Sequence, residues 1–368
     1  MATVGSSAPS TNTIYYDSLL STTLAAMRKT MYDNIFKDSA FLAYLRMSNA
    51  VTTQNGGERV SMPLMYGKND TIGVHSGYEV IDTTPQDGMT TAFYEWAEIA
   101  GSISISRKEE RQNSGEGRLL NLLEQKIKQA EMSMREELNE GLVLGKVSDA
   151  TFVPKTSIGG ANGLNPLGYF LRKLNATDPT AGGNVGNISG STYSWWRHHT
   201  GDFGNNAVTG QSVKLSITTY AGMIAALRRM YNYCSRGSGG SPDLVLFDQV
   251  SFETYENSLD TRVRYQNTKM ADMGFDTVKL RGATCIWDEK VPDIYTGTEA
   301  ITVGSAFFLN TEFYKLIIDS ETDIVTTPFV EPENQTAKTA KVLFMGQAAV
   351  SNMRKHGVAM SISQSIVA

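Results

Sequence analysis

An amphipathic segment at residues 118–144 limits the folds open to this chain more than any other feature. Its apolar side chains recur every three or four positions, with charged residues opposite them, which is the pattern of a one-sided α-helix. The apolar positions are Leu119, Leu123, Ile127, Ala130, Met134, Leu138 and Leu142. A helix of this length would span about 40 Å. We therefore predict a long rod that lies against a partner along one side.

The apolar period changes to two between residues 58 and 106, which indicates β-strands. Alternation runs through residues 60–66 and again through residues 99–105, and we predict that these two strands pair as a long hairpin. Pro63 has no backbone N–H, so it requires an edge position or a gap in the ladder. The segment 67–88 is rich in turn residues and would form the tip. A two-stranded ribbon is marginally stable alone, so it should lie on something else.

The remaining periodic segments predict further helices and strands. Residues 17–34 read as a helix, preceded by a Ser/Thr-rich arm that needs an external anchor, and an apolar cluster follows at residues 41–45. The other predicted helices cover residues 217–234 and 252–259, and the other predicted strands cover residues 244–247, 277–280, 284–287, 306–309, 316–318, 341–345 and 358–362. Mixed helices and strands in this order indicate an α+β fold.

Residues 149–211 are rich in Gly, Asn, Ser and Thr, and their periodic signals are few. We interpret them as an irregular, partly ordered insertion, because structureless loops of this length are uncommon in a compact domain. Trp195 and Trp196 could stack a base or a ligand. No basic groove accompanies them, so packing of the insertion or contact with a neighbour is the favoured interpretation.

Composition excludes several classes of protein. The 368 residues contain 33 Lys+Arg and 38 Asp+Glu, a net charge of -5, so there is no positive excess for a dedicated nucleic-acid binder. No run of 18 apolar residues occurs, and the first ten residues lack the basic and apolar regions of a signal peptide. Membrane insertion and secretion are therefore not expected. Cys234 and Cys285 are isolated, which predicts two free, buried thiols.

Candidates for chemistry are few. His198 and His199 lie near Asp202, which suggests a metal site, but adjacent side chains usually point apart and no zinc-binding spacing is present. We interpret both as surface or packing histidines, and we expect His75 and His356 to be solvated. Residues 237–241, Gly-Ser-Gly-Gly-Ser, follow a helix and lack the lysine of a phosphate-binding loop, so they predict a helix stop and a flexible connector. We predict no enzymatic activity and no cofactor.

The order of the elements resembles the major capsid proteins of tailed bacteriophages, with the Hong Kong 97 fold. Several strings are similar to one branch of phage coat proteins: DNIF at 33–36, GSTYSWWR at 190–197, SPDLVL at 241–246, VRY at 263–265, FLNT at 308–311 and SNMRK at 351–355. The resemblance implies an N-arm with a helix (1–57), an E-loop hairpin (58–106), a P-domain spine helix (107–148), an A-domain with its insertion (149–325) and P-domain return strands (326–368).

The resemblance also implies a function. In the family, the E-loop lies over an adjacent subunit and A-domains meet around five-fold and six-fold axes, so we expect a structural subunit whose pentamers and hexamers build an icosahedral shell around packaged double-stranded DNA. The candidate contact residues at the tip of the E-loop are Gly67, Lys68, Asn69, Asp70 and His75. The implied setting is a virion capsid assembled in the host cytoplasm.

The family also suggests partners. We expect a separate scaffolding protein and a portal protein, with a decoration protein as a further candidate partner. We expect DNA to be enclosed without sequence-specific binding, and we expect no membrane. Lys68 and Asn352 are the positions to try for the subunit crosslink of some relatives, but no local motif aligns them, so we predict none. Three alternatives stay open: an encapsulin-like compartment, a soluble metal-dependent enzyme using His198 and His199, and a tail or fibre component.

Overall fold

The computed structural model describes residues 39–112, 122–143, 145–148, 151–154, 163–171, 184–203, 212–213, 217–237, 239–259, 278–291, 304–333 and 336–362. The predicted helix over 17–34 and the arm before it lie outside these residues. The chain divides into two compact units, of which the smaller comprises Met1–Lys37, Gly101–Ser133 and Thr326–Val342. In the part of the chain described, no helix is long and apolar enough to cross a membrane.

The described part of the smaller unit consists of two strand segments and two helices or parts of helices. Its elements are the second part of β4 (Ala97–Ser106), α3 (Arg107–Gln112), the first part of α4 (Leu122–Val143) and the first part of β16 (Ala337–Val350). Ser106 and Glu109 form a capping box at the start of α3: each side chain accepts from the other's backbone N–H, at 3.2 and 3.1 Å. Lys126 on α4 donates to the carbonyl of Ser104 and pairs with Glu109 at 3.2 Å.

The larger unit is built around a six-stranded sheet of order β11-β12-β10-β13-β17-β9. Its strands are β9 (His199–Asp202), β10 (Leu244–Phe247), β11 (Val278–Leu280), β12 (Ala283–Trp287), β13 (Ser305–Leu309) and β17 (Gly357–Met360). Strand β10 runs parallel to β12 and antiparallel to β13. Every residue of β10, β13 and β17 is buried, which explains why these strands are continuous apolar runs.

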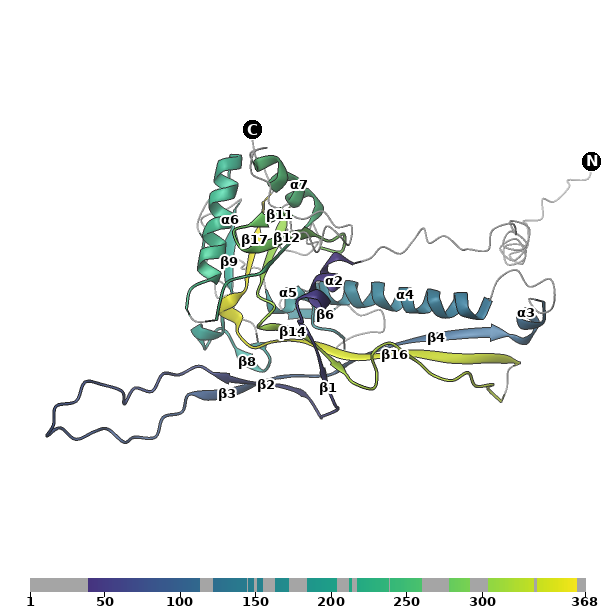
Figure 1. Ribbon diagram of the computed structural model, residues 1–368, viewed down its shortest axis with the longest axis horizontal. Coiled ribbons are helices and arrows are strands. Elements are labelled where there is room, and N and C mark those ends of the chain that lie inside the picture. Colours follow the sequence, from purple (N-terminus) through teal and green to yellow (C-terminus); the bar gives the residue numbers. More distant parts are fainter. Residues whose placement is uncertain are drawn as a thin grey trace, which may run out of the picture. The chain divides into compact units, whose positions relative to one another are not determined.

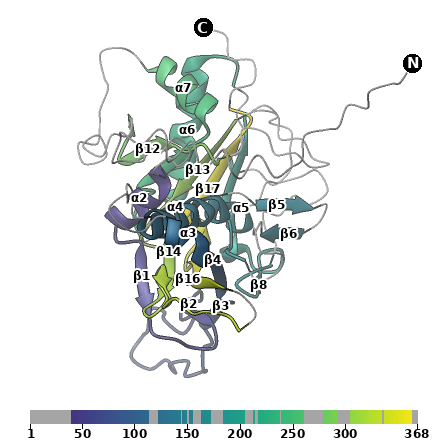
Figure 2. The same cartoon turned by 90° about the vertical axis from the view of Figure 1, so that its right-hand side faces the viewer.

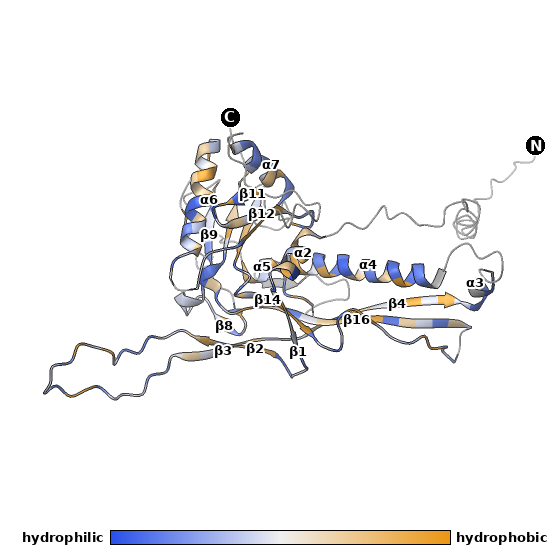
Figure 3. Cartoon of the chain, in the orientation of Figure 1, coloured by the Kyte–Doolittle hydropathy of each residue, from blue (hydrophilic) through white to orange (hydrophobic). Residues whose placement is uncertain are grey.

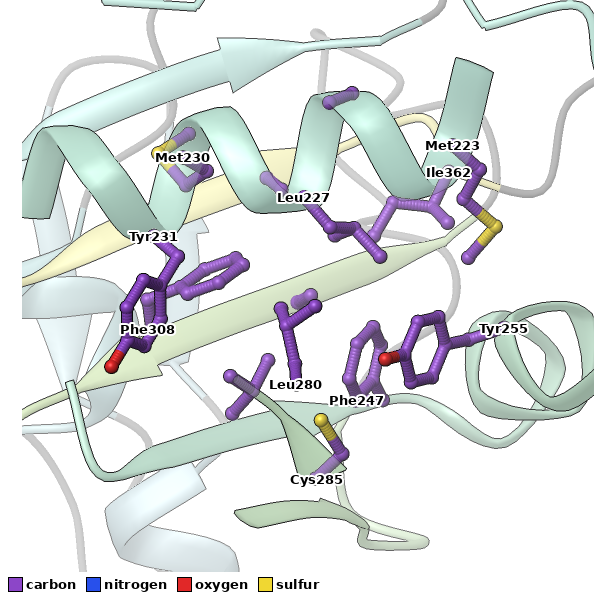
Figure 4. Close-up of a cluster of buried hydrophobic side chains, with 14 of the residues drawn as sticks. Met223, Leu227, Met230, Tyr231, Phe247, Tyr255, Leu280, Cys285, Phe308 and Ile362 are labelled. Atoms are coloured by element: carbon purple, nitrogen blue, oxygen red, sulfur yellow. The ribbon is translucent and has the colours of Figure 1, made fainter. Parts of the chain in front are cut away.

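Two helices cover one face of this sheet (Figures 1 and 2). They are α6 (Tyr220–Cys234), capped by the Thr219 side chain, and α7 (Gln249–Ser258), capped by Asp248. Apolar residues at three- and four-residue spacing place Met223, Leu227 and Met230 of α6 against the sheet (Figure 4). The resulting core of fully buried side chains holds this part of the molecule together.

A second sheet has the order β1-β14-β16-β15, with β4 also on β16. Its further strands are β1 (Val51–Gln54), β14 (Tyr314–Asp319) and β15 (Val325–Thr326). Helix α2 (Ala40–Met47) begins at Ser39, and Asp288 accepts hydrogen bonds from Ser39, from the Phe41 N–H and from Asn139 on α4. The smaller elements are β2 (Val60–Met65), β3 (Met89–Tyr94), β5 (Gly145–Ser148), β6 (Thr151–Pro154), α5 (Leu167–Phe170), β7 (Asn184–Val185), β8 (Ile188–Ser189), η2 (Ser194–Trp196) and η3 (Met353–Lys355).

The predicted pairing of the ribbon is wrong. Strand β2 pairs antiparallel with β3, a strand that the sequence pattern did not single out, and the predicted partner at residues 99–105 belongs to β4, which pairs with β16. The alternation was correct for each strand, since β2 and β4 both show one buried and one exposed side over most of their length. Pro63 has a neighbour only on the β3 side, as its missing N–H requires.

The two predicted tail strands are present, as part of β16 and as β17. Strand β17 pairs with β13 in the six-stranded sheet, and all of its residues are buried. One further expectation needs correction. The segment 149–211 is less irregular than expected, because its residues 199–202 form β9, the edge strand next to β17. Single-residue alternation cannot distinguish a strand with one wet side from one covered on both sides.

Candidate intersubunit contact site

The β2–β3 hairpin ends in a glycine pair. Its ladder runs from Val60 opposite Tyr94 to Met65 opposite Met89. The N–H groups of Tyr66 and Gly67 then both donate to the carbonyl of Gly88, at 2.9 and 3.3 Å. A Cβ added at Gly67 would lie 3.0 Å from the Gly88 Cα, and one added at Gly88 would lie 3.3 Å from the Gly67 carbonyl oxygen, so glycine is favoured at both positions where the arms come this close.

Beyond this point the two arms form no ladder. Residues 68–87 are all described, and none of them is in a β-strand. Polar side chains instead satisfy nearby backbone: Asn69 accepts from the Thr71 N–H, Glu79 from the Ser76 N–H and Asp82 from the Thr84 N–H. The hydrogen bonds from Thr84 lower the pKa of Asp82. We call residues 68–87 the ribbon tip; its backbone presents unpaired groups to any strand that approaches.

Large apolar side chains stand in solvent along the ribbon tip. Val74, Tyr78 and Val80 are fully exposed, and Ile72 is 82% exposed. A turn in which the Glu79 N–H donates to the Ser76 carbonyl at 2.8 Å separates Ile72 and Val74 from Val80, so apolar side chains are exposed on both sides of the turn. We call Ile72, Val74, Tyr78 and Val80 the apolar stripe. Figure 3 shows this part of the hairpin with apolar residues interspersed among polar ones. Contiguous exposed apolar residues on a folded protein mark an interaction surface.

The structure places the five predicted contact residues in and beside this segment. Gly67 closes the ladder, while Lys68, Asn69, Asp70 and His75 are exposed in the ribbon tip. The prediction rested on polar and turn residues and missed the apolar stripe. Its signal was present in the sequence, because Ile72, Val74, Tyr78 and Val80 already alternate with other residues there.

The base of the hairpin is held firmly within the larger unit. The buried Tyr94 donates its hydroxyl hydrogen to the Val350 carbonyl at 2.8 Å, and burial raises the pKa of this tyrosine. The Phe93 N–H donates to the carbonyl of Gly186 at 3.0 Å. Gly186 has φ +58, and a Cβ there would lie 2.8 Å from the Ala92 Cβ, so only glycine allows this approach.

A buried glutamine joins the hairpin to β16. Gln347 is 2% exposed, accepts from the Asn165 N–H at 2.8 Å and donates to the carbonyls of Glu95 and Gly163 at 2.8 and 3.3 Å. Because the Gln347 side chain is buried and bonds to three separate backbone groups, losing it would remove three hydrogen bonds at once. The base is therefore rigid where the ribbon tip has no ladder.

The two tryptophans pack as expected. Trp196 is buried and donates its indole N–H to the Val185 carbonyl at 3.0 Å, while the ring of Trp195 stacks on Tyr66 at 4.9 Å between centroids. Both rings are thereby engaged with the chain itself. Trp195 fixes the point at which the ribbon tip leaves the hairpin base.

The histidines do not assemble a metal site. His198 and His199 are adjacent residues on extended backbone, so their side chains point to opposite sides, and Asp202 lies an odd number of positions from His199. Among the described residues, no three His, Cys, Asp or Glu side chains come close enough to hold a metal ion. His75 is exposed as predicted.

His356 was predicted to be solvated, and this is wrong: it is 1% exposed, and burial lowers its pKa to about 3. The flexible connector is also wrong. The helix does stop at Cys234, but Lys355 is buried, and its ammonium donates to the carbonyls of Arg236, Gly237 and Gly240 at 3.0–3.2 Å. Burial lowers the pKa of Lys355. This loop is a binding site for the chain's own lysine.

The crosslink candidates lie in different settings. Lys68 is exposed in the ribbon tip, whereas Asn352 caps η3 by accepting from the Arg354 N–H at 3.2 Å. The two cysteines are buried and free, as predicted.

Comparison with known proteins shows similarity in structure without detectable similarity in sequence. No family model matches the chain, and no curated protein matches it. Among solved structures, the capsid asymmetric unit of cyanophage A-1(L) has a TM-score of 0.60 at 15% identity and covers 94% of this chain and 99% of that chain. The capsid of Myoviridae phage XM1 and the capsid of the native GTA particle have TM-scores of 0.53 and 0.52 at 10% identity, each covering 91% of this chain and 95% of the other.

These matches extend over nearly the whole of both chains, so the similarity concerns the complete fold rather than one common motif. At such low identity the comparison establishes architecture. The chain therefore has the Hong Kong 97-type fold of tailed-phage major capsid proteins.

Proposed function

We propose that this chain is the structural subunit of a tailed-phage capsid, and that its pentamers and hexamers close an icosahedral shell around double-stranded DNA. The observation that carries the proposal is the ribbon tip, whose apolar side chains and unpaired backbone are left in solvent by the single chain. A second copy that covers the tip would bury both.

The charge of the chain is compatible with a container. With a net charge of -5, the subunit has no overall positive excess to bind DNA through counterion release, so packaged DNA would be enclosed rather than bound tightly. We infer assembly in the host cytoplasm with a separate scaffolding protein and a portal protein, and a decoration protein is the further candidate partner. The proposal assigns no catalytic role and no crosslink to the chain.

Electron microscopy of the purified chain tests the proposal. We expect rings or closed shells from the unaltered protein, and loss of both from the double variant Tyr78→Ser with Val80→Ser, because it removes apolar area from the contact. The matched control is Thr83→Ser with Gln86→Asn, which alters the same segment without changing an apolar residue. A monodisperse monomer from the unaltered chain would contradict the function, and shells indifferent to the tip variant would contradict the contact.

A further inference from the structure

The outward side of α6 carries positive charge only. The helix contains Arg228 and Arg229 and no Asp or Glu, and Arg236 follows shortly after its end. All three arginines are exposed, because the buried residues Met223, Leu227 and Met230 occupy the opposite side against the sheet (Figure 4). We call Arg228, Arg229 and Arg236 the basic stripe.

Contacts with neighbouring groups orient two arginines in this region. The guanidinium of Arg236 lies 3.9 Å from the centre of the Tyr233 ring. Arg281, in the turn between β11 and β12, donates to Asn232 at 2.5 Å on the outward side of α6.

Helix α7 has the opposite character. It contains Glu253 and Glu256 and no Lys or Arg. Val250, Glu253 and Asn257 are exposed at three- and four-residue spacing, so they form one outward side, while Phe252 and Tyr255 are buried beneath them. Gln249 donates to the Glu253 carboxylate at 3.0 Å and orients it. Glu253 supplies the negative charge of this side, and we call Val250, Glu253 and Asn257 together the acidic stripe.

We propose that the basic stripe of α6 in one copy of the chain binds the acidic stripe of α7 in the next copy. Pairing α6 with α6, or α7 with α7, would oppose like charges, whereas pairing α6 with α7 joins opposite ones. Such a contact uses two different surfaces, so a pair of copies still presents one free stripe of each kind, and repetition gives a ring when the rotation between copies closes. The inference rests on the proposed function, for which it supplies the contact that joins neighbours within a capsomer.

Shape favours a helix over a nucleic acid as the occupant. The same side of α6 carries Ala221 and Ala225 before the basic stripe; both are exposed, and small side chains allow another helix to approach closely. Val250 is 41% exposed on α7, three residues before Glu253. When the two helices run parallel with Glu253 beside Arg229, Val250 lies about 4.5 Å and Ala225 about 6 Å toward the N-terminus, so they fall within about one residue of each other. The apolar residue of α7 then lies near the small residues of α6 while the two charged residues face each other.

A charge swap tests this contact. We expect Arg229→Glu and Glu253→Arg each to raise the concentration needed for ring formation at least tenfold at low salt, since each opposes like charges. The double variant should restore assembly, and Arg229→Lys, which keeps the charge, should assemble nearly as the unaltered chain does. Sedimentation velocity measures the oligomers, and thermal unfolding shows that each variant is folded.

The outcomes separate this inference from the proposed function. Shells that depend on the ribbon tip but form normally with Arg229→Glu would overturn the helix contact and leave the function standing. If the double variant assembled no better than the single variants, the helix contact would also be overturned. Binding of a 20-base-pair DNA duplex that is lost in Arg229→Glu and stays lost in the double variant would instead identify DNA as the partner of the basic stripe. A chain that forms no oligomer would contradict both.

Discussion

The six-stranded sheet and the ribbon tip use extended backbone in opposite ways. In the sheet, β10, β13 and β17 have a neighbour on each side and every residue is buried. In the ribbon tip, residues 68–87 form no strand, and Val74, Tyr78 and Val80 are fully exposed. The sheet satisfies its backbone and its apolar surface within one chain, whereas the ribbon tip can do so only by contact with another.

This difference separates folding from assembly within one sequence. Changes in the sheet should alter the free energy of unfolding, and changes in the ribbon tip should leave it almost unchanged. The hairpin base between them, held by Tyr94 and Gln347, should behave like the sheet. Each prediction below compares a residue of the folded core with a matched residue of the exposed hairpin.

The largest difference should appear in thiol reactivity. Cys234 and Cys285 are fully buried, and burial raises the pKa of both thiols, so neither should react until the unit opens. A third cysteine introduced by Ser76→Cys in the ribbon tip should react at the rate of a free thiol. Since core groups open only with free energies near that of global unfolding, we expect a ratio of rates of roughly 10³ or more.

Labelling with a chromogenic disulfide reagent at pH 8 measures the three rates. In guanidinium chloride all three thiols should react alike, which serves as the control. Rapid reaction of Cys234 in the native chain would mean that the core between α6 and the sheet is open.

The second-largest difference should appear in the free energy of unfolding when a phenylalanine is truncated. Phe308 of β13 is fully buried, and Phe308→Ala should lower the free energy of unfolding by about 3–5 kcal/mol through lost burial and a cavity. Phe93 of β3 is 42% exposed, so Phe93→Ala should cost less than about 1.5 kcal/mol. Urea titrations of the unassembled chain compare the two, and equal losses would contradict the distinction.

Acid should destabilise the core through His356. Burial lowers the pKa of His356 to about 3, whereas the unfolded chain titrates near 6.5, so the unfolded state binds more protons between these values. Stability should be level above pH 6.5 and fall below it, by up to about 1.4 kcal/mol per pH unit from this residue. The urea midpoint measured from pH 7.5 to pH 5 reports the slope.

Two variants isolate the source of that slope. His356→Asn removes the titrating ring but keeps an acceptor for the Asn310 N–H, which now donates to His356 at 3.3 Å. The slope should become shallower without vanishing, because burial also lowers the pKa of His199, to about 4. His75→Asn in the exposed ribbon tip should leave the slope unchanged. An unchanged slope in His356→Asn would assign the acid sensitivity to other groups.

Local patterns in the sequence predicted the elements but not their partners. The one-sided helix, the alternation of β2 and the apolar run of β10 each follow from neighbours within a few residues, and all three are present. Strand β4 was assigned to β2 because both alternate, yet its partner is β16, more than 200 residues away. A period of two specifies one buried side without specifying what buries it.

The buried polar residues were missed for a related reason. His356 stands between Lys355 and Gly357, which suggested a solvated turn, but Lys355 is itself buried because three backbone carbonyls from residues 236–240 receive its ammonium. That arrangement brings together segments more than 100 residues apart. The apolar stripe of the ribbon tip, by contrast, is local, and its alternation could have been recognised in the sequence.

The smallest difference should locate the boundary between the two regions inside the hairpin. Tyr94 and Tyr78 lie on the same arm, but only Tyr94 is buried, with its hydroxyl on the Val350 carbonyl. Tyr94→Phe leaves that buried carbonyl without its donor and should cost about 1–2 kcal/mol, whereas Tyr78→Phe removes a hydroxyl that faces water and should cost nothing measurable. Thermal unfolding of the unassembled chain measures both. If Tyr94→Phe were as neutral as Tyr78→Phe, the hairpin base would belong with the ribbon tip, and the rigid attachment on which the contact depends would have to lie elsewhere.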